Sequence, residues 1–141
     1  MLEQVHHRLT VDTKGPGFTD VTAGVADWLK AAGAKDGLLT VFIRHTSASL
    51  TIQENADPDV LRDLEDALDQ AAPRSAPYRH SQEGPDDMPG HIRSMLTSTT
   101  LGIPVVSGRT VLGTWQAIYL IEHRDRPRSR EIVLHYVGTR T

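Results

Sequence analysis

Two segments near the C-terminus constrain the fold most, because each is apolar on both faces of an expected strand. Side chains alternate between the two sides of a strand, so a strand that covers one side of a core alternates apolar and polar residues. The segments 115–122 (WQAIYLIE) and 132–137 (IVLHYV) do not alternate in this way. Each must therefore be covered on both sides by helices, a second sheet or another copy of the chain.

Further strands are expected at 4–11, 37–45, 47–55 and 104–112, and the two apolar segments extend to strands at 115–123 and 131–138. The segment 37–45 (GLLTVFIRH) is rich in residues that favour strands. The segment 47–55 follows it closely, and we expect it to return as the antiparallel partner of 37–45.

Helical spacing of apolar residues predicts three helices between these strands. The first covers 19–33, and the second begins at Pro58 with Asp57 as its cap. The third is short and starts at Pro89. Its apolar residues are expected to point inward, namely Ile92, Met95 and Leu96.

The order of these elements predicts an α+β fold with mainly antiparallel β-sheets and about three helices. A chain of 141 residues suits one domain, over 1–141. Three modest helices cannot cover both faces of every apolar strand, so we expect contacts between subunits to cover the rest.

Composition and charge narrow the functional classes. Cysteine is absent, which excludes disulfides and thiolate chemistry. No apolar run approaches the roughly 18 residues of a membrane span, and the N-terminus lacks the apolar core of a signal peptide. The net charge of −3 gives no general attraction to nucleic acid. We therefore expect a cytoplasmic protein with neither a membrane nor a nucleic acid as partner.

The stretch 79–92 (RHSQEGPDDMPGHI) is too rich in reactive side chains for an ordinary surface loop. Imidazoles and carboxylates are both metal ligands and general acids or bases. The two aspartates before Pro89 also fit a second role, because carboxylates cap a helix N-terminus. The residues concerned are His80, Glu83, Asp86, Asp87 and His91.

Two further histidines stand at the ends of apolar rows. His45 ends the row of alternate residues in the strand 37–45, and His123 ends the corresponding row in 115–123. A row that changes from aliphatic to imidazole favours a core that opens into a pocket, whereas a single such histidine is more often a half-exposed edge residue. Because the pattern occurs twice, we favour a pocket shared with 79–92.

Several residues are suited to holding an anion or a flat ring. Ser47 and Ser49 offer hydroxyls beside His45, and a guanidinium can clamp phosphate with two hydrogen bonds. The basic cluster 123–130 (HRDRPRSR) is a phosphate site or a solvated hairpin tip, and charge alone favours the tip. Trp115 can stack on a flat heterocycle, although a tryptophan is more often in the core. The candidate phosphate clamps are Arg93, Arg124 and Arg130.

Common nucleotide and hydrolase signatures are absent. The sequence contains no GxGxxG, no GxxxxGK[ST] and no GxSxG. The HExxH pattern of zinc proteases is also missing. A dinucleotide site, a P-loop, a serine-hydrolase elbow and a zincin are therefore not indicated.

Three blocks of the chain resemble, in order and spacing, the signatures of the YjbQ family, whose members are described as secondary thiamine-phosphate synthases. The blocks are HTSASLTIQENADPDV, YRHSQEGPDDMPGHIRS and LGTWQAIYLIEHRDRPRSREIVLHYVG. The resemblance implies a single YjbQ-like domain that assembles as a homotrimer. It also implies a polar pocket near a subunit boundary, formed by the histidine and carboxylate blocks, that binds metal ions or anions.

Three functions remain open on this basis. The first is a metal-assisted transferase that joins hydroxymethylpyrimidine diphosphate to a thiazole phosphate, giving thiamine phosphate and pyrophosphate. The second is a metal-dependent hydrolase of a small phosphorylated metabolite, and the third is a trimer that binds a metal or an anionic metabolite without chemistry. The expected cofactor is a divalent metal ion, zinc or magnesium.

Each candidate residue has an expected role in this site. The metal ligands are His45, His91 and His123, with His80 as the substitute for any of them. The catalytic group comprises His80, Glu83, Asp86 and Asp87, in which Glu83 or Asp87 is the base or supports a ligand. The substrate-binding residues are Ser47, Ser49, Asn55, Arg93, Thr114, Trp115, Gln116, Arg124 and Arg130.

Overall fold

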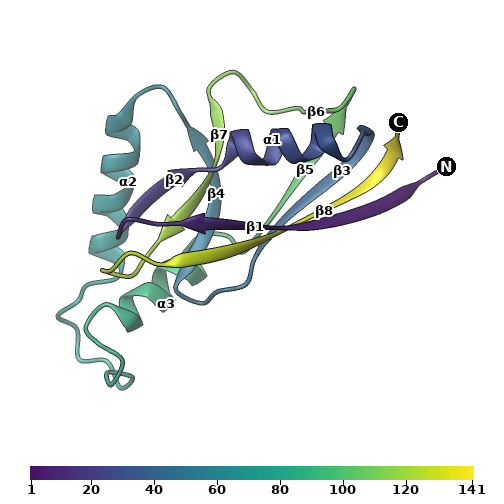
Figure 1. Cartoon of the computed structure of the whole chain (residues 1–141). Coiled ribbons are helices and arrows are strands. Elements are labelled where there is room, and N and C mark those ends of the chain that lie inside the picture. Colours follow the sequence, from purple (N-terminus) through teal and green to yellow (C-terminus); the bar gives the residue numbers. More distant parts are fainter.

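A computed structural model describes residues 1–141 of the chain and contains three helices and eight strands (Figure 1). In chain order the elements are β1 (Glu3–Asp12), β2 (Gly17–Asp20), α1 (Thr22–Ala31), β3 (Ala34–Ile43), β4 (Ala48–Glu54), α2 (Pro58–Ala71), α3 (Asp87–Leu96), β5 (Thr100–Val106), β6 (Arg109–Thr110), β7 (Gln116–Glu122) and β8 (Ser129–Arg140).

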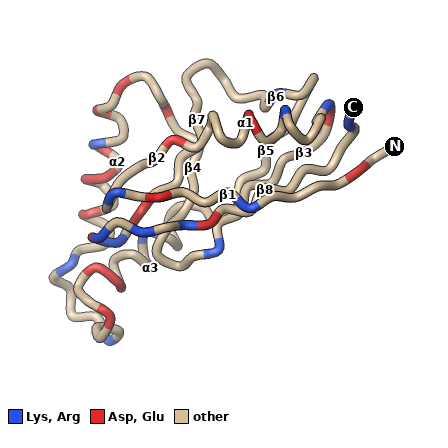
Figure 2. Tube along the Cα trace, in the orientation of Figure 1, with Lys and Arg blue, Asp and Glu red and all other residues tan.

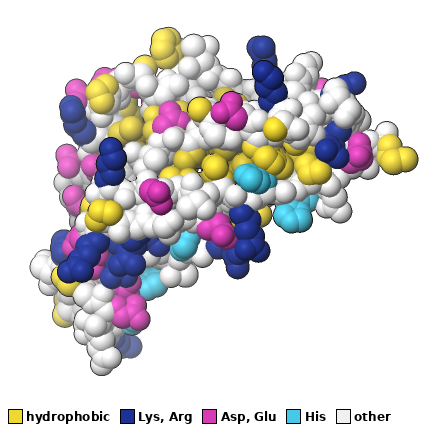
Figure 3. Space-filling view, viewed as in Figure 1, with side chains coloured by type: hydrophobic (Ala, Val, Ile, Leu, Met, Phe, Trp, Pro, Cys, Tyr) yellow, Lys and Arg dark blue, Asp and Glu magenta, His cyan; other side chains and the backbone are white.

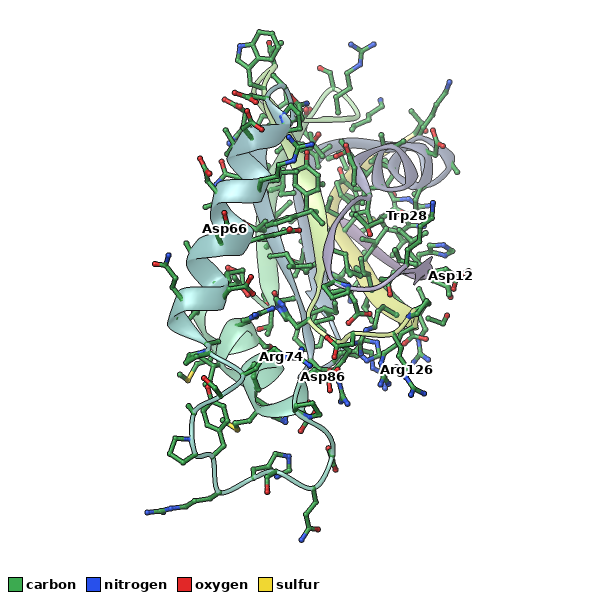
Figure 4. All side chains as sticks on the ribbon, turned by 90° about the vertical axis from the view of Figure 1, so that its left-hand side faces the viewer. Asp12, Trp28, Asp66, Arg74, Asp86 and Arg126 are labelled. Carbon is green, nitrogen blue, oxygen red and sulfur yellow. The ribbon has the colours of Figure 1, made fainter.

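The strands form two antiparallel sheets. One has the order β1-β8-β3-β5-β6 and the other the order β2-β7-β4. A shared core lies between them, with side chains from both sheets and from α1, such as Leu134, Leu120 and Val25. Helix α2 covers the outer face of the smaller sheet (Figure 4). This confirms the expected α+β fold with mainly antiparallel sheets and three helices. None of the helices has the length and apolar character needed to cross a membrane.

The strand β7 is covered on both sides, as its sequence predicts. Every residue from Ala117 to His123 is buried, because one face of β7 meets the larger sheet and the other lies under α2. The strand β8 differs. Its alternate residues Ile132, Leu134 and Tyr136 are buried, whereas Val137, which points to the other face, is exposed. The outer face of the larger sheet thus remains uncovered within one chain.

The pairing expected for 47–55 is wrong. The strand β4 pairs with β7, whereas both edges of β3 are occupied, by β5 and by β8. β3 ends at Ile43, so residues 44–47 carry the chain from the larger sheet to the smaller one. His45 and Ser47 therefore lie at a corner between two sheets and not in a continuous hairpin.

The expected strand 104–112 is in fact a hairpin of β5 and β6. Ser107 and Gly108 have φ angles of 52° and 80°, which is the conformation of a tight two-residue turn between antiparallel strands. The turn reverses the chain, and Val105 pairs with Thr110. Ser-Gly is a weaker turn signal than Asn-Gly or Asp-Gly, so the sequence pattern alone favours one uninterrupted strand.

The third helix begins two residues earlier than predicted, and its orientation also differs. α3 starts at Asp87, and its buried residues are Asp87, Pro89, Gly90 and Ser94. Met95 is 79% exposed and Leu96 is also exposed, so the expectation that both point inward is wrong. Polar contacts of Asp87, described below, fix the face that α3 turns toward the protein.

At one point β3 and β8 approach too closely for side chains. A Cβ at Gly37 would lie 2.2 Å from the carbonyl oxygen of Val137, and a Cβ at Gly138 would lie 2.3 Å from that of Asp36. The register of the two strands also shifts between Ala34 and Gly37. Both positions therefore require glycine.

Candidate functional site

Three side chains of the 79–92 stretch converge at the start of α3. The Nε2 atom of His80 lies 2.7 Å from Oδ2 of Asp87, and Nε2 of His91 lies 3.2 Å from the same oxygen. One ligand atom from each of the three lies within 4.8 Å of the others. Asp87 is only 3% exposed, whereas both imidazoles are partly open to solvent. The result is a cluster with a buried carboxylate beneath two accessible histidines.

Local structure explains this convergence. Asp87 and His91 are four residues apart in α3, so they share one face of the helix. His80 comes from the preceding loop, which is held in place by contacts at its start. There Arg74 makes two hydrogen bonds to Asp125, of 2.8 and 2.9 Å, and the Tyr78 hydroxyl donates to the Pro73 carbonyl at 2.6 Å.

Arg124 supports the cluster from the other side. Its Nη1 donates to Oδ1 of Asp87 at 2.7 Å, and its Nε donates to Oδ2 of Asp86 at 2.9 Å. The Asp125 amide also donates to Asp86 at 2.9 Å. Asp86 occupies the N-cap position of α3 and Asp87 is its first residue, but neither carboxylate makes a side-chain cap. The two carboxylates therefore orient Arg124 and the cluster.

Asp87 is ionised at neutral pH. Burial alone would raise the pKa of its carboxyl group, but the hydrogen bond with His80 and the charges of His91 and Arg124 outweigh burial and lower this pKa below the usual value. The pKa of Asp86 is lowered in the same way, against burial, by hydrogen bonds from Arg124 and Asp125. The cluster thus presents a negative charge to any cation that enters.

The donor atoms fit a divalent transition metal. Two imidazole nitrogens and one carboxylate oxygen are ligands that Zn²⁺ and similar ions take in catalytic sites, where three protein ligands leave a position for water or substrate. Glu83 lies at the rim, with Oε2 3.8 Å from Nε2 of His80. His80, expected only as a substitute ligand, is therefore a full member of the set.

The structure does not bring His45 and His123 to this cluster. Nε2 of His45 accepts a hydrogen bond from the Glu131 amide at 3.0 Å. Nε2 of His123 lies 2.9 Å from Oγ of Ser49, to which Thr97 donates at 2.5 Å. These contacts fix the corner between the sheets and the end of α3. Of the three expected ligands, only His91 belongs to the cluster.

Burial makes His123 a neutral residue. Its side chain is almost fully enclosed, and this burial, with the charge of Arg93 as a smaller cause, lowers the pKa of the imidazole to about 4. Burial also lowers the pKa of His45. The two histidines therefore remain uncharged at neutral pH and serve as hydrogen-bonding groups at the sheet corner.

All three expected phosphate clamps are already paired with carboxylates. Arg93 forms an ion pair with Asp69 on α2, and Arg124 binds Asp86 and Asp87. Arg130 is 5% exposed and makes a two-point ion pair with Glu122, which also accepts a 2.7 Å hydrogen bond from Thr13. The charge of a residue in the sequence does not show which arginines form ion pairs with carboxylates in the folded protein.

The remaining expected substrate-binding residues lie at two ends of the β4–β7 pair. Ser47 accepts from Arg130 and Ser49 contacts His123, at the end near α3. At the other end the Asn55 amide donates to the Trp115 carbonyl at 3.0 Å. Seven residues of strand separate the ends by about 20 Å. Within one chain, the residues at the far end cannot contact a small molecule bound at the cluster, namely Asn55, Thr114, Trp115 and Gln116.

Trp115 is also not a core residue, since it is 65% exposed. An aromatic side chain near the cluster comes instead from Tyr78, which lines a cleft of about 360 Å³ beside His80. Met88 and Pro89 of α3 line the same cleft. Met88 stands within the block 78–94 that carries the family resemblance, and its side-chain type alone predicts no role in a site.

Comparison with known proteins identifies close relatives over nearly the full chain. The family model described as UPF0047 protein YjbQ-like matches residues 7–139. A UPF0047 protein of Synechocystis is 52% identical over 131 residues, which is 92% of this chain and 89% of that protein. The UPF0047 protein YjbQ of Escherichia coli O157:H7 is 44% identical over 131 residues, 92% of this chain and 95% of that protein.

Two solved structures share the fold. A conserved hypothetical protein of Thermus thermophilus superposes with a TM-score of 0.81 at 39% identity, over 91% of this chain and 97% of that chain. A YbjQ-like protein of Sulfolobus solfataricus superposes with a TM-score of 0.90 at 21% identity, over 99% of this chain and 100% of that chain.

Proposed function

Because the chain belongs to the UPF0047 family of YjbQ-like proteins, we propose that it is a metal-assisted transferase of the thiamine-phosphate synthase type, acting on phosphorylated heterocycles. The resemblance described above suggests the reaction. The observation that carries the proposal is the convergence of His80, Asp87 and His91 within 4.8 Å beside a cleft that Tyr78 lines.

A divalent metal would be held by Nε2 of His80, Nε2 of His91 and Oδ2 of Asp87. When bound, it supplies positive charge that stabilises a departing diphosphate. Asp87 gives the cluster its negative charge, and Arg124 holds the other oxygen of that carboxylate, at 2.7 Å. The two imidazoles are partly exposed, so a ligand has access to the open side of the cluster.

The protein residues around the cluster perform the remaining tasks. In the proposed reaction a ring nitrogen of the thiazole forms a C–N bond to the pyrimidine methylene carbon, and the C–O bond to diphosphate breaks. The aromatic side chain of Tyr78 and the flat surface of Pro89 position a heterocycle in the cleft. Glu83, exposed at the rim, is placed to exchange a proton with a bound group.

A hydrolase of a small phosphorylated metabolite is the second candidate. It is favoured by the ligand set itself, because two histidines and one carboxylate with an open position are typical of zinc sites that activate water. A trimer that binds a metal or an anionic metabolite without chemistry is the third. The location in the cytoplasm remains a prediction.

Assembly as a homotrimer is part of the proposal. It is supported by the uncovered face of the larger sheet, where Leu38 and Phe42 of β3 are 44% and 43% exposed. Val106 of β5 and Val137 of β8 are also exposed. An apolar sheet face of this kind is typical of a surface that another subunit covers.

Metal binding and pyrophosphate release test the proposal together. Chelator-treated protein is titrated with Zn²⁺, Mn²⁺ and Mg²⁺, and metal content is measured before and after reloading. The loaded protein is then assayed with hydroxymethylpyrimidine diphosphate alone, with the thiazole phosphate alone, and with both. We expect one metal per chain and release of pyrophosphate only when both substrates are present.

Other outcomes separate the candidates. Release of phosphate or pyrophosphate from one substrate alone would favour the hydrolase. Stoichiometric metal with no turnover of either substrate would favour the binding protein. A protein that takes up no metal after reloading would refute the metal-assisted mechanism.

A further inference from the structure

A second cavity, entirely polar, lies next to the histidine cluster. It is a groove of about 320 Å³ between the turn before α3 and the hairpin that joins β7 to β8. No hydrophobic residue lines it. Its lining consists of Glu83, Gly84, Pro85, Asp86, Arg124, Asp125, Arg126 and Arg128. Figure 4 shows Arg126 and Asp86 at the same end of the molecule, below the two sheets.

The arginines of this groove are of two kinds. Arg124 is neutralised by Asp86 and Asp87, and Asp125 by Arg74. Arg126 and Arg128 are exposed and form no ion pair. Figure 3 shows the gathering of Lys and Arg side chains at this end of the molecule, and Figure 2 shows these charges on the chain near the start of β8. Two free positive charges therefore face the groove.

The groove and the histidine cluster share a wall. Asp87 contributes Oδ2 to the cluster, while its Oδ1 accepts from Arg124 at 2.7 Å. Arg124 also donates to the Glu83 carbonyl at 3.0 Å, which fixes the turn that borders the groove. The groove and the cleft beside His80 also border the same turn, at Gly84 and Pro85.

Charge indicates what kind of ligand fits. Two guanidinium groups without partners, together with a divalent ion at the cluster, would provide about four positive charges, against Glu83 and the one negative charge by which Asp86 and Asp87 exceed Arg124. A diphosphate group, with oxygens on two phosphorus atoms, can contact the guanidinium groups and the cluster at once, which suits this arrangement better than one phosphate. Guanidinium groups also match phosphate oxygens geometrically.

We propose that Arg126 and Arg128 form the diphosphate-binding half of the site, and that the groove accepts the diphosphate of the substrate or product. This rests on the proposed function and deepens it, because it assigns the group that leaves in the reaction to a defined place. The hairpin tip 123–130 is then a binding element and more than a solvated turn.

The experiment uses inorganic pyrophosphate as the probe, by calorimetric titration of full-length protein, both chelator-treated and reloaded with Mg²⁺. Wild type is compared with Arg126→Gln/Arg128→Gln and with the matched control Lys30→Gln/Arg109→Gln. Lys30 and Arg109 are exposed cationic residues that line another cavity, at the end of α1 beside β6, so the control removes the same charge. Figure 1 shows β6 and the β7–β8 hairpin at opposite ends of the molecule.

We expect the groove variant to bind pyrophosphate roughly 100-fold more weakly, about 10-fold for each charge-assisted contact. The control should retain wild-type affinity, and orthophosphate should bind wild type at least 10-fold more weakly than pyrophosphate. Equal weakening in both double variants, equal affinity for the two anions, or no pyrophosphate binding by wild type would each overturn the assignment. Zn²⁺ titration of the same proteins tests the metal cluster separately. Metal binding can therefore be found when the diphosphate assignment fails, and pyrophosphate binding can be found when no metal binds.

Discussion

Asp87 and His91 lie one turn apart in α3, and the Oδ2 atom of the aspartate is 3.2 Å from Nε2 of the histidine. Because the same oxygen is 2.7 Å from Nε2 of His80, a single carboxylate oxygen holds two imidazoles from different elements. The helix supplies two of the three donors, and the loop supplies the third.

Replacement of His91 by alanine tests the metal cluster. We expect His91→Ala to weaken Zn²⁺ binding by at least about 100-fold, because one of three ligands is lost and loss of even a supporting contact costs 10- to 100-fold. The measurement is calorimetric titration of chelator-treated protein. His6→Ala, at an exposed position of β1, serves as the control. Unchanged affinity in His91→Ala would remove this residue from the ligand set.

Replacement of Arg124 by lysine tests support of the cluster. Lysine keeps the charge but cannot bind Asp86 and Asp87 at the same time through a planar guanidinium. We expect Arg124→Lys to lower Zn²⁺ affinity about 10-fold while circular dichroism shows an intact fold. Arg62→Lys, at an exposed pair with Asp59 on α2, should bind metal like wild type. A loss of Zn²⁺ affinity in both variants would point to a general effect of replacing arginine by lysine and would contradict the specific role of Arg124.

The buried histidine His123 predicts how stability depends on pH. Its pKa is lowered from 6.5 to about 4 in the folded protein, so the unfolded chain binds more protons between these values. The contribution is complete above about pH 6.5 and is lost as the pH falls toward 4, amounting to at most about 3 kcal/mol.

We expect the free energy of unfolding, from urea titrations at several pH values, to fall over this range in wild type. The slope should be smaller in His123→Asn. The control His6→Asn, at an exposed position, should keep the wild-type slope. An imidazole of His123 that titrates near pH 6.5 in NMR spectra would contradict the prediction.

The ion pair of Glu122 and Arg130 predicts a large loss of stability. Glu122→Gln leaves the guanidinium of Arg130 buried without its counter-charge, which costs about 3–5 kcal/mol. Chemical denaturation at pH 7 measures this change. Asp59→Asn breaks an exposed pair with Arg62 and should leave stability nearly unchanged. A small effect of Glu122→Gln would mean that water reaches Arg130.

A charge on the uncovered sheet face should prevent assembly. Phe42→Asp places a carboxylate among the exposed apolar side chains of β3 and its neighbours, and we expect a monomer by light scattering where wild type is a trimer. Ala23→Asp introduces the same charge at an exposed position of α1, on the opposite side of the larger sheet, and should remain trimeric. A monomeric wild type would refute the proposed trimer.

The sequence predicted the elements well where periodicity was long. The helix α2 begins at Pro58 as expected, and Asp57 caps it by accepting a hydrogen bond from the Asp59 amide. Sequence patterns failed to predict the structure in two places. The strand β2 has only four residues, which are too few to show a periodic pattern. The strand β4 pairs with β7 because the chain turns a corner between the two sheets, and no local signal marks that corner.

The composition of the candidate site was predictable, but its partners were not. The stretch 79–92 contains the whole cluster of His80, Asp87 and His91. The roles of Arg93, Arg124 and Arg130 could not be read from their type, since a guanidinium that clamps phosphate and one that pairs with a buried carboxylate look alike in sequence. Only tertiary contacts distinguish them.

The close approach of β3 and β8 at Gly37 and Gly138 has a consequence for evolution. Because neither position has room for a methyl group, substitutions there should be removed by selection on folding before any selection on activity. An alignment of relatives would then show two invariant glycines, one in β3 and one in β8. Both lie at the end of the larger sheet that is far from α3. A ranking of positions by invariance would count them with the reactive residues, although their requirement is purely steric.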